Sequence, residues 1–201
     1  MNDSYKTIEK QSTGYFKDKG SKFHSYAFPL GNEEEVKDII SRLKKEHHGA
    51  RHHCYAWRLG TEEIQFRAND DGEPSSTAGK PILGQLLSFE LTNILVVVVR
   101  YFGGTLLGVS GLINAYKNAT ADALKNADII EKHIEKKYQI DFTYNELNEV
   151  MHILKQENFN IINTDFQENC SLIFSVRKSY SEKAEKIFNK MYKVLFKPLL
   201  E

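Results

Sequence analysis

The sequence has few cysteines and no apolar run long enough to cross a membrane. Cys54 and Cys170 are the only two cysteines, and they lie far apart without metal-type spacing. Neither a disulfide framework nor a zinc knuckle is therefore expected. The first residues, from Met1 to Tyr5, lack the basic and apolar regions of a signal peptide, so we expect a cytoplasmic protein that makes no membrane contact.

The sequence also lacks an excess of charge of either sign. Its 27 Lys and Arg residues balance 27 Asp and Glu residues, so no strong global field draws the protein to nucleic acid or to a membrane surface. Any binding of nucleic acid must be local. At 201 residues the chain is long enough for one large domain or two small ones.

The stretch from Leu95 to Tyr116 predicts a buried strand, a glycine-rich turn and a helix in succession. The run from Val96 to Val99 is continuously apolar and β-branched, which is typical of a strand buried on both faces at the centre of a sheet. A helix that follows such a turn offers free backbone N–H groups and the positive end of its dipole to an anion such as phosphate. Arg100 stands beside that point. The predicted anion site uses Gly103, Gly104, Gly108 and Gly111.

A purely structural role for the same glycines is equally open. Gly103-Gly104 and Gly108-x-x-Gly111 do not spell the dinucleotide-binding fingerprint, and no Gly-Lys-Ser or Gly-Lys-Thr ending marks a nucleotide-binding P-loop. Glycines also permit tight turns and close packing of a helix. Both interpretations stand at the level of the sequence.

The segments before this stretch predict an α+β domain that ends at residue 128. Two hairpins are expected, one over residues 5–28 with its turn at Gly20 and one over residues 54–67. A helix is expected between them, over residues 32–49. The first region is therefore predicted to mix strands and helices.

A long polar loop over residues 68–82 links the second hairpin to the helix that precedes the buried strand. It is dense in turn-forming residues, and loops of this length in compact domains are often functional or mobile. Thr77 is expected to cap that helix, which continues to about Glu90.

Two groups of side chains have residue types that could perform chemistry. Asp70, Asp71 and Glu73 could bind a cation or act as acid and base, although Asp-Asp-Gly is also ordinary turn chemistry, which we favour. Four histidines cluster nearby, but adjacent strand residues such as His52 and His53 point to opposite faces and cannot easily bind one metal. No catalytic residue, metal or cofactor is therefore predicted.

The remaining residues, 129–201, predict a second domain with the element order βαββαβ, the split pattern of ferredoxin-like folds. Its last helix is expected to include Tyr192 in an apolar stripe. Lysines at three- and four-residue spacing form a basic face on the other side of this helix, for which we favour a solvated surface over an RNA-facing patch. These lysines are Lys183, Lys186, Lys190 and Lys193.

Four ordered motifs occupy about the first 130 residues. They are Ser21-Lys-Phe23, His53-Cys-Tyr-Ala-Trp57, Asp70-Asp-Gly-Glu-Pro74 and Arg100-Tyr-Phe-Gly-Gly104. These motifs resemble the YigZ/IMPACT family. The remainder of the chain is similar to the small C-terminal domain of the bacterial, YigZ-type members, so the resemblance covers nearly the whole sequence.

The resemblance implies a first domain similar to a small-subunit ribosomal protein and to domain IV of elongation factor G. It implies a second domain similar to the ferredoxin-like domain V of that factor. Eukaryotic relatives are linked to control of translation initiation through a protein partner of a stress kinase, and bacterial members are suspected of binding nucleic acid or the ribosome. No catalytic residues are established for the family, so none can be transferred to this sequence.

The leading hypothesis is a translation-associated binding protein that contacts RNA, the ribosome or a translation-control protein. Its surface would combine Arg100, Gly103, Gly104 and Lys80 with the loop from Asp70 to Thr77. A metal-assisted hydrolase or phosphotransferase that uses the carboxylates of this loop is the competing hypothesis. A third hypothesis is a regulator that binds a small anionic metabolite at the glycine pair.

Overall fold

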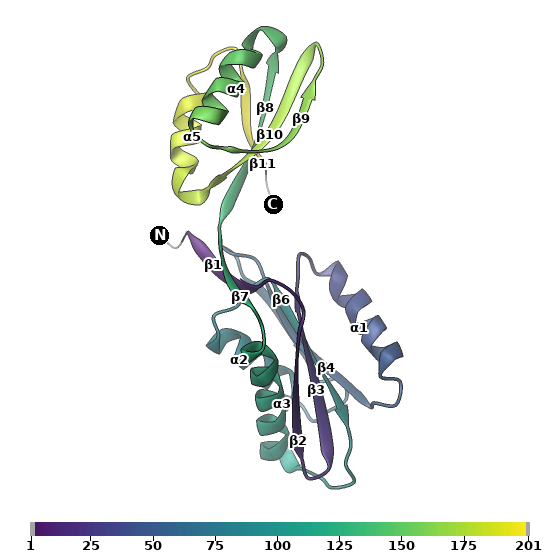
Figure 1. The fold of residues 1–201 in the computed structure, drawn as a ribbon. Helices are drawn as coiled ribbons and strands as arrows, with labels where there is room; N and C mark the ends of the chain where they lie inside the picture. Colours follow the sequence, from purple (N-terminus) through teal and green to yellow (C-terminus); the bar gives the residue numbers. More distant parts are fainter. Residues whose placement is uncertain (1–2, 200–201) are drawn as a thin grey trace. The chain divides into compact units, whose positions relative to one another are not determined.

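The computed structural model describes residues 3–199 and has the predicted α+β composition, with helices packed on mixed sets of strands (Figure 1). The chain divides into two compact units by its internal contacts. One unit is Tyr5–Lys132, and the other comprises residues 3–4 and 133–199. No helix among these residues is long and apolar enough to cross a membrane.

The first unit is built on a five-stranded sheet in which every neighbouring pair is antiparallel. The strand order across the sheet is β2-β3-β6-β4-β5, so β6 lies at the centre, as the apolar run predicts. The expected hairpins are confirmed as the pairs β2–β3 and β4–β5. The strands are β2 (Ser12–Asp18), β3 (Ser21–Pro29), β4 (His52–Leu59), β5 (Gln65–Asn69) and β6 (Ile94–Tyr101).

Three helices cover the two faces of this sheet (Figure 1). Helix α1 (Glu34–Glu46) lies on one face, and helices α2 (Gly79–Ser88) and α3 (Gly108–Lys125) lie on the other. Alternate residues of a strand point to opposite faces, so β6 must be apolar on both sides. Val96 and Val98 accordingly belong to the core under α2 and α3, while the residues between and beside them pack in the core under α1.

A separate two-stranded sheet joins the beginning of the chain to the residues after α3. It pairs β1 (Ser4–Ile8) with β7 (Ile129–His133). The sequence predicts a first hairpin whose opening strand starts at Tyr5, whereas the structure divides this segment into β1 and β2, and β7 is a strand that the sequence analysis did not identify. The backbone N–H of Glu9 donates to the carbonyl oxygen of Asp128 at 2.9 Å, just after β1 and just before β7. The pairing ends there, and β2 begins at Ser12.

The second unit has the element order β8-α4-β9-β10-α5-β11 and an antiparallel sheet in the order β11-β8-β10-β9. Its core combines aliphatic side chains with aromatic ones, of which Tyr138, Phe174 and Phe188 are fully buried. Short 3-10 turns, η1 (Tyr144–Glu146) and η2 (Lys178–Tyr180), precede the two helices. The elements are β8 (Glu135–Thr143), α4 (Leu147–Gln156), β9 (Asn160–Phe166), β10 (Asn169–Arg177), α5 (Ser181–Phe188) and β11 (Leu195–Leu199).

Candidate binding site

The polar loop before α2 is organised by the side chain of Asp70. Its carboxylate accepts hydrogen bonds from the backbone N–H groups of Ser76, Ala78 and Gly79 at 2.8, 3.0 and 2.8 Å, and it thereby caps α2. Burial by itself raises the pKa of Asp70, but these hydrogen bonds outweigh it and hold the pKa below its ordinary value. The expectation that Thr77 caps this helix is wrong, because its hydroxyl donates to the carbonyl oxygen of Pro74 at 2.7 Å.

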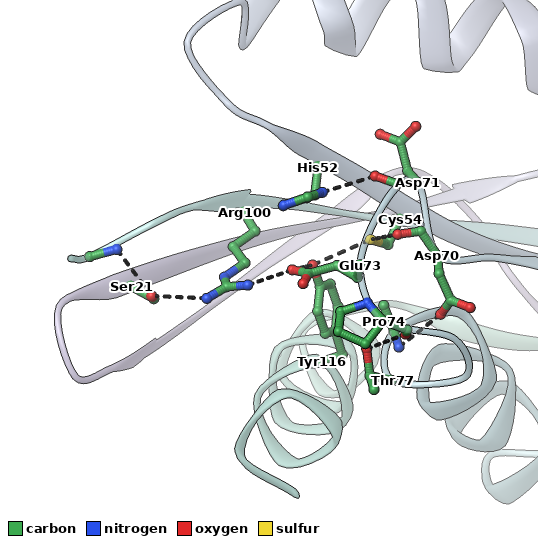
Figure 2. Close-up of polar contacts among 12 residues, drawn as sticks. Ser21, His52, Cys54, Asp70, Asp71, Glu73, Pro74, Thr77, Arg100 and Tyr116 are labelled. Carbon is green, nitrogen blue, oxygen red and sulfur yellow. Dashed lines mark hydrogen bonds and ion pairs between the residues drawn. The ribbon is translucent and has the colours of Figure 1, made fainter. Parts of the chain in front are cut away.

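The neighbouring carboxylate of Asp71 serves a different element. It accepts a hydrogen bond of 2.6 Å from the backbone N–H of His53 and one of 3.3 Å from Lys44 Nζ. The Asp71 carbonyl oxygen lies 2.9 Å from Nδ1 of His52. Figure 2 shows that the carboxylates of Asp70 and Asp71 point in opposite directions. This loop is therefore tied to strand β4 on one side and to α2 on the other.

The third acidic side chain of the loop, Glu73, is buried against Arg100. Nη1 of Arg100 donates to Oε1 of Glu73 at 2.7 Å, and the hydroxyl of Tyr116 donates to the same oxygen at 2.8 Å (Figure 2). Arg100 is only 5% exposed, and its guanidinium lies over the rings of Phe23 and Phe102 at 5.5 and 5.7 Å. The sequence places Arg100 beside an anion site, and the structure supplies Glu73 as its intramolecular anion.

Cys54 belongs to the same buried network, although no sequence pattern connects it with Glu73. Its Sγ lies 3.0 Å from the carbonyl oxygen of Asp70 and 3.3 Å from the hydroxyl of Tyr116. Burial raises the pKa of the Cys54 thiol well above its ordinary value. A thiol in this state is not a nucleophile at neutral pH.

The contacts of the three loop carboxylates bear on the hydrolase hypothesis. Each of the three loop carboxylates is engaged by a different part of the first unit, and no group of three metal-ligating side chains occurs within residues 3–199. The paired-carboxylate geometry required by the hydrolase hypothesis is therefore not formed by Asp70, Asp71 and Glu73.

The glycine-rich turn after β6 is packed against the hairpin turn of β2 and β3. A Cβ atom at Gly103 would overlap the backbone of Gly20 and Ser21, so only glycine fits there. The Gly103 N–H donates to Oγ of Ser21 at 3.1 Å. Gly104 and Gly108 have positive φ angles of 89° and 72° and open space beside them. Close packing thus explains Gly103, whereas backbone conformation explains Gly104 and Gly108.

A pocket of about 370 Å³ opens between this turn, the Asp70–Thr77 loop and the start of α3. Glu73 and Arg100 contribute buried polar groups to it, and Arg51 and His52 contribute further polar side chains. Its other walls are predominantly apolar, with Pro74, Phe102, Leu106, Leu107, Gly108, Val109 and Leu112. The pocket therefore combines a buried ion pair with an apolar lining beside a helix N-terminus.

The predicted site residues fall into separate groups. Arg100, Glu73 and Gly108 line the pocket. Asp70, Thr77 and Lys80 lie at the start of α2, and Asp71 lies against β4. The remaining predicted glycines, Gly103, Gly104 and Gly111, lie in or just after the turn between β6 and α3.

The predicted basic face belongs to the other unit and is not one continuous helical surface. Helix α5 ends at Phe188, so Lys190 and Lys193 lie beyond it, and Tyr192 is 91% exposed instead of joining an apolar stripe. Three of the lysines have acidic partners: Lys183 pairs with Glu157, Lys186 lies 3.9 Å from Glu182 and Lys193 lies 3.9 Å from Glu146. These pairs reduce the local positive charge that the lysine spacing predicts.

Comparison with known proteins identifies the family. A sequence model described as the Impact N-terminal domain matches residues 19–124, which is more than half of the chain. The chain belongs to the IMPACT family. The resemblance seen in the four sequence motifs is thereby confirmed, and the matched region of this IMPACT-family protein contains the whole pocket.

Curated relatives and a solved structure extend the similarity beyond the first unit. An IMPACT family member of Haemophilus influenzae is 38% identical over 169 residues, which cover 82% of this chain and 81% of the relative. YigZ of Escherichia coli is 38% identical over 151 residues, which cover 74% of each chain. A crystal structure of a hypothetical protein is 29% identical, with a TM-score of 0.74 and full coverage of both chains.

Proposed function

We propose that this IMPACT-family protein is a translation-associated binding protein and that the rim of the pocket is its contact surface. Membership of the family supports the translation role, since eukaryotic relatives are linked to control of translation initiation. The engagement of Asp70, Asp71 and Glu73 in separate structural contacts supports binding over catalysis.

The observation that carries the proposal is the exposure of apolar side chains around the pocket. Leu106 is 82% exposed, Val109 is 60% exposed and Phe102 is 45% exposed. Contiguous apolar surface with a polar border is typical of a protein–protein contact. The rim of the pocket therefore favours a protein component of the translation apparatus as the partner.

An RNA backbone is the alternative partner. Arg51 in the pocket lining supports it, and so does Lys80, which lies outside that lining and is exposed in the first turn of α2. Contacts with phosphate release counterions, so RNA binding would weaken steeply with salt. An apolar protein contact would persist from low to physiological salt.

Sedimentation of a cell lysate through a sucrose gradient tests the proposal. We expect the wild-type protein to co-migrate with ribosomal particles at both low and physiological salt. The Leu106→Asp variant should stay at the top of the gradient. Leu87→Asp is the matched control, because Leu87 is an exposed leucine on α2 outside the pocket lining. Wild-type protein that stays at the top in both salts contradicts a ribosome-associated role, and loss of co-migration only at physiological salt identifies the RNA version.

The proposal includes a finer assignment of the two domains. The sequence predicts their boundary at residues 128 and 129, and the first compact unit of the structure extends to Lys132. We assign the first to the ribosomal-protein and elongation factor G domain IV type, and the second to the ferredoxin-like type of domain V. The βαββαβ order of the second unit, with its antiparallel sheet, supports the second assignment. Superposition of an experimental structure on those domains of elongation factor G tests both assignments.

A further inference from the structure

We propose that the pocket beside Arg100 binds a carboxylate attached to an apolar body of about the size of one aromatic or branched side chain. The inference rests on the proposed function, because it names what the same surface recognises in a partner. Its two possible sources are the C-terminal residue of a protein and a free small acid, which share this chemistry.

The first argument is an unpaired hydrogen-bond donor on a side chain that lines the pocket. Arg100 lines it, and two of its nitrogens are engaged by Glu73 and Ser21, with Nη2 lying 3.5 Å from Oγ of Ser21. The third nitrogen, Nε, is buried and has no hydrogen-bond partner among the described residues. Buried donors in folded proteins are nearly always paired, so this guanidinium has hydrogen-bonding capacity that the described protein groups do not use.

The second argument is the start of α3 in the pocket wall. The wall includes Leu107, Gly108 and Val109, where the 18-residue helix begins, and the first N–H groups of a helix have no partner within it. The first turn of α3 contains no acidic side chain. Gly108 has open space where a Cβ would lie, which leaves its backbone accessible. The positive end of this helix is therefore available to an anion.

The charges of the lining favour a monoanion. Two arginines and one glutamate line the pocket, which leaves one positive charge in excess when His52 is neutral. A phosphate dianion or a polyphosphate carries more negative charge than this single excess positive charge would neutralise. A single carboxylate matches it, and arginine side chains and helix N-termini are both suited to carboxylates.

The apolar walls exclude a bare anion as the complete ligand. Phe102, Leu106 and Val109 are exposed beside the polar groups, and the volume of about 370 Å³ lies in the range of small-molecule sites. A bare anion would leave these side chains in water. A ligand that places an apolar group against them removes this surface from water while its carboxylate reaches the polar end.

Titration of the ¹⁵N-labelled 201-residue protein, followed by NMR, tests the inference. The probes are N-acetyl-phenylalanine, its neutral amide, a short peptide that ends in phenylalanine with a free or an amidated terminus, and inorganic phosphate. We expect the free acids to shift the amide signals of residues 102–109 saturably. The neutral amides should bind at least about ten-fold more weakly, because they lack charge-assisted hydrogen bonds.

The two sources give different results within the same titration. Tighter binding of the peptide acid than of the single amino-acid derivative identifies a protein C-terminus, and equal binding identifies a free small acid; both results support the proposal. Equal binding of acid and amide, no saturable shift, or binding of phosphate as tight as that of N-acetyl-phenylalanine would each overturn it. The Leu106→Asp variant should lose the acid, and the Leu87→Asp control should keep it.

The titration tests the carboxylate inference and the gradient tests the proposed function, so one can be contradicted while the other stands. Loss of acid binding with ribosomal co-migration intact removes the carboxylate inference and leaves the proposed function standing. Acid binding without co-migration removes the translation role and leaves a ligand site. Thermal unfolding of both leucine variants verifies that any loss arises in a folded protein.

Discussion

The guanidinium of Arg100 donates a 2.7 Å hydrogen bond to Glu73, a residue 27 positions earlier in the chain. The contact joins the central strand of the first unit to the loop before α2, and both side chains are almost completely buried. Removal of one partner from a buried ion pair leaves an uncompensated charge, which is far more unfavourable than the loss of an exposed pair. The pair therefore stabilises the contact between β6 and the loop before α2, and both of its residues line the proposed ligand pocket.

Glu73→Gln should lower the free energy of unfolding by about 3–5 kcal/mol, because it leaves the buried Arg100 without a counter-charge. Urea denaturation at neutral pH measures this value. Glu63→Gln, in the exposed turn between β4 and β5, is the control and should change it by less than about 0.5 kcal/mol. A Glu73→Gln effect as small as that of the control would show that the pair contributes little.

Asp70→Asn should lower the free energy of unfolding by about 1–2 kcal/mol at pH 7, because a neutral amide replaces the charged cap of α2. The pKa of Asp70 is held below its ordinary value of 3.8 in the folded state. Its contribution is therefore complete above this value and declines as the pH falls further, through the folded pKa.

Denaturation midpoints between pH 2 and pH 7 measure this dependence. The wild-type protein should lose stability more steeply than Asp70→Asn as the medium is acidified below about pH 4. Parallel curves for the two proteins would contradict the assigned cap. Asp38→Asn, an exposed substitution on α1, is the control and should reproduce the wild-type slope.

Gly103→Ala should destabilise the first unit by about 3 kcal/mol or more, because its Cβ would overlap the backbone of the neighbouring turn. Gly104→Ala meets no neighbour but has a φ of 89°, so its effect should be about 1–2 kcal/mol. Gly84→Ala, exposed in α2 with open space around it, should instead stabilise by about 0.5–1 kcal/mol. Thermal unfolding of the three variants tests this order, and equal effects at positions 103 and 104 would contradict the packing argument.

Neither cysteine should react with Ellman's reagent in the folded protein, because Cys54 and Cys170 are both buried. Both should react once the chain is unfolded in urea. Ser110→Cys provides a positive control, since residue 110 is exposed in the first turn of α3, where the helix dipole lowers the pKa of a thiol. Rapid native-state labelling of the wild-type protein would contradict the buried network around Cys54.

The central strand and the hairpins could be predicted because their signals are local. The run Val96 to Val99 contains no polar residue, so neither face of the strand is polar there, which is typical of a strand covered on both faces. The turn of the first hairpin requires a positive φ, which is 82° at Gly20, and glycine is the residue that adopts such an angle most readily. A glycine between two apolar segments therefore predicts the turn. Packing partners are not required to recognise such patterns.

The site could be predicted only in part because its contacts are long-range. The sequence groups Asp70, Asp71 and Glu73 by proximity, whereas the fold directs them to α2, β4 and Arg100. Thr77 is a plausible cap by position, but Asp70 reaches the same N–H groups from farther back in the chain. The apolar rim at Leu106 was missed because a single exposed leucine has no distinguishing pattern in a sequence.

The pairing of β1 with β7 has a consequence for synthesis on the ribosome. Strand β1 emerges among the first residues, yet its partner strand is not made until residue 133 has been added. The nascent chain must therefore hold β1 unpaired while the five-stranded sheet and α3 are completed. Because the ribosomal tunnel retains the most recent residues, closure of this last strand pair waits until part of the second unit has been translated.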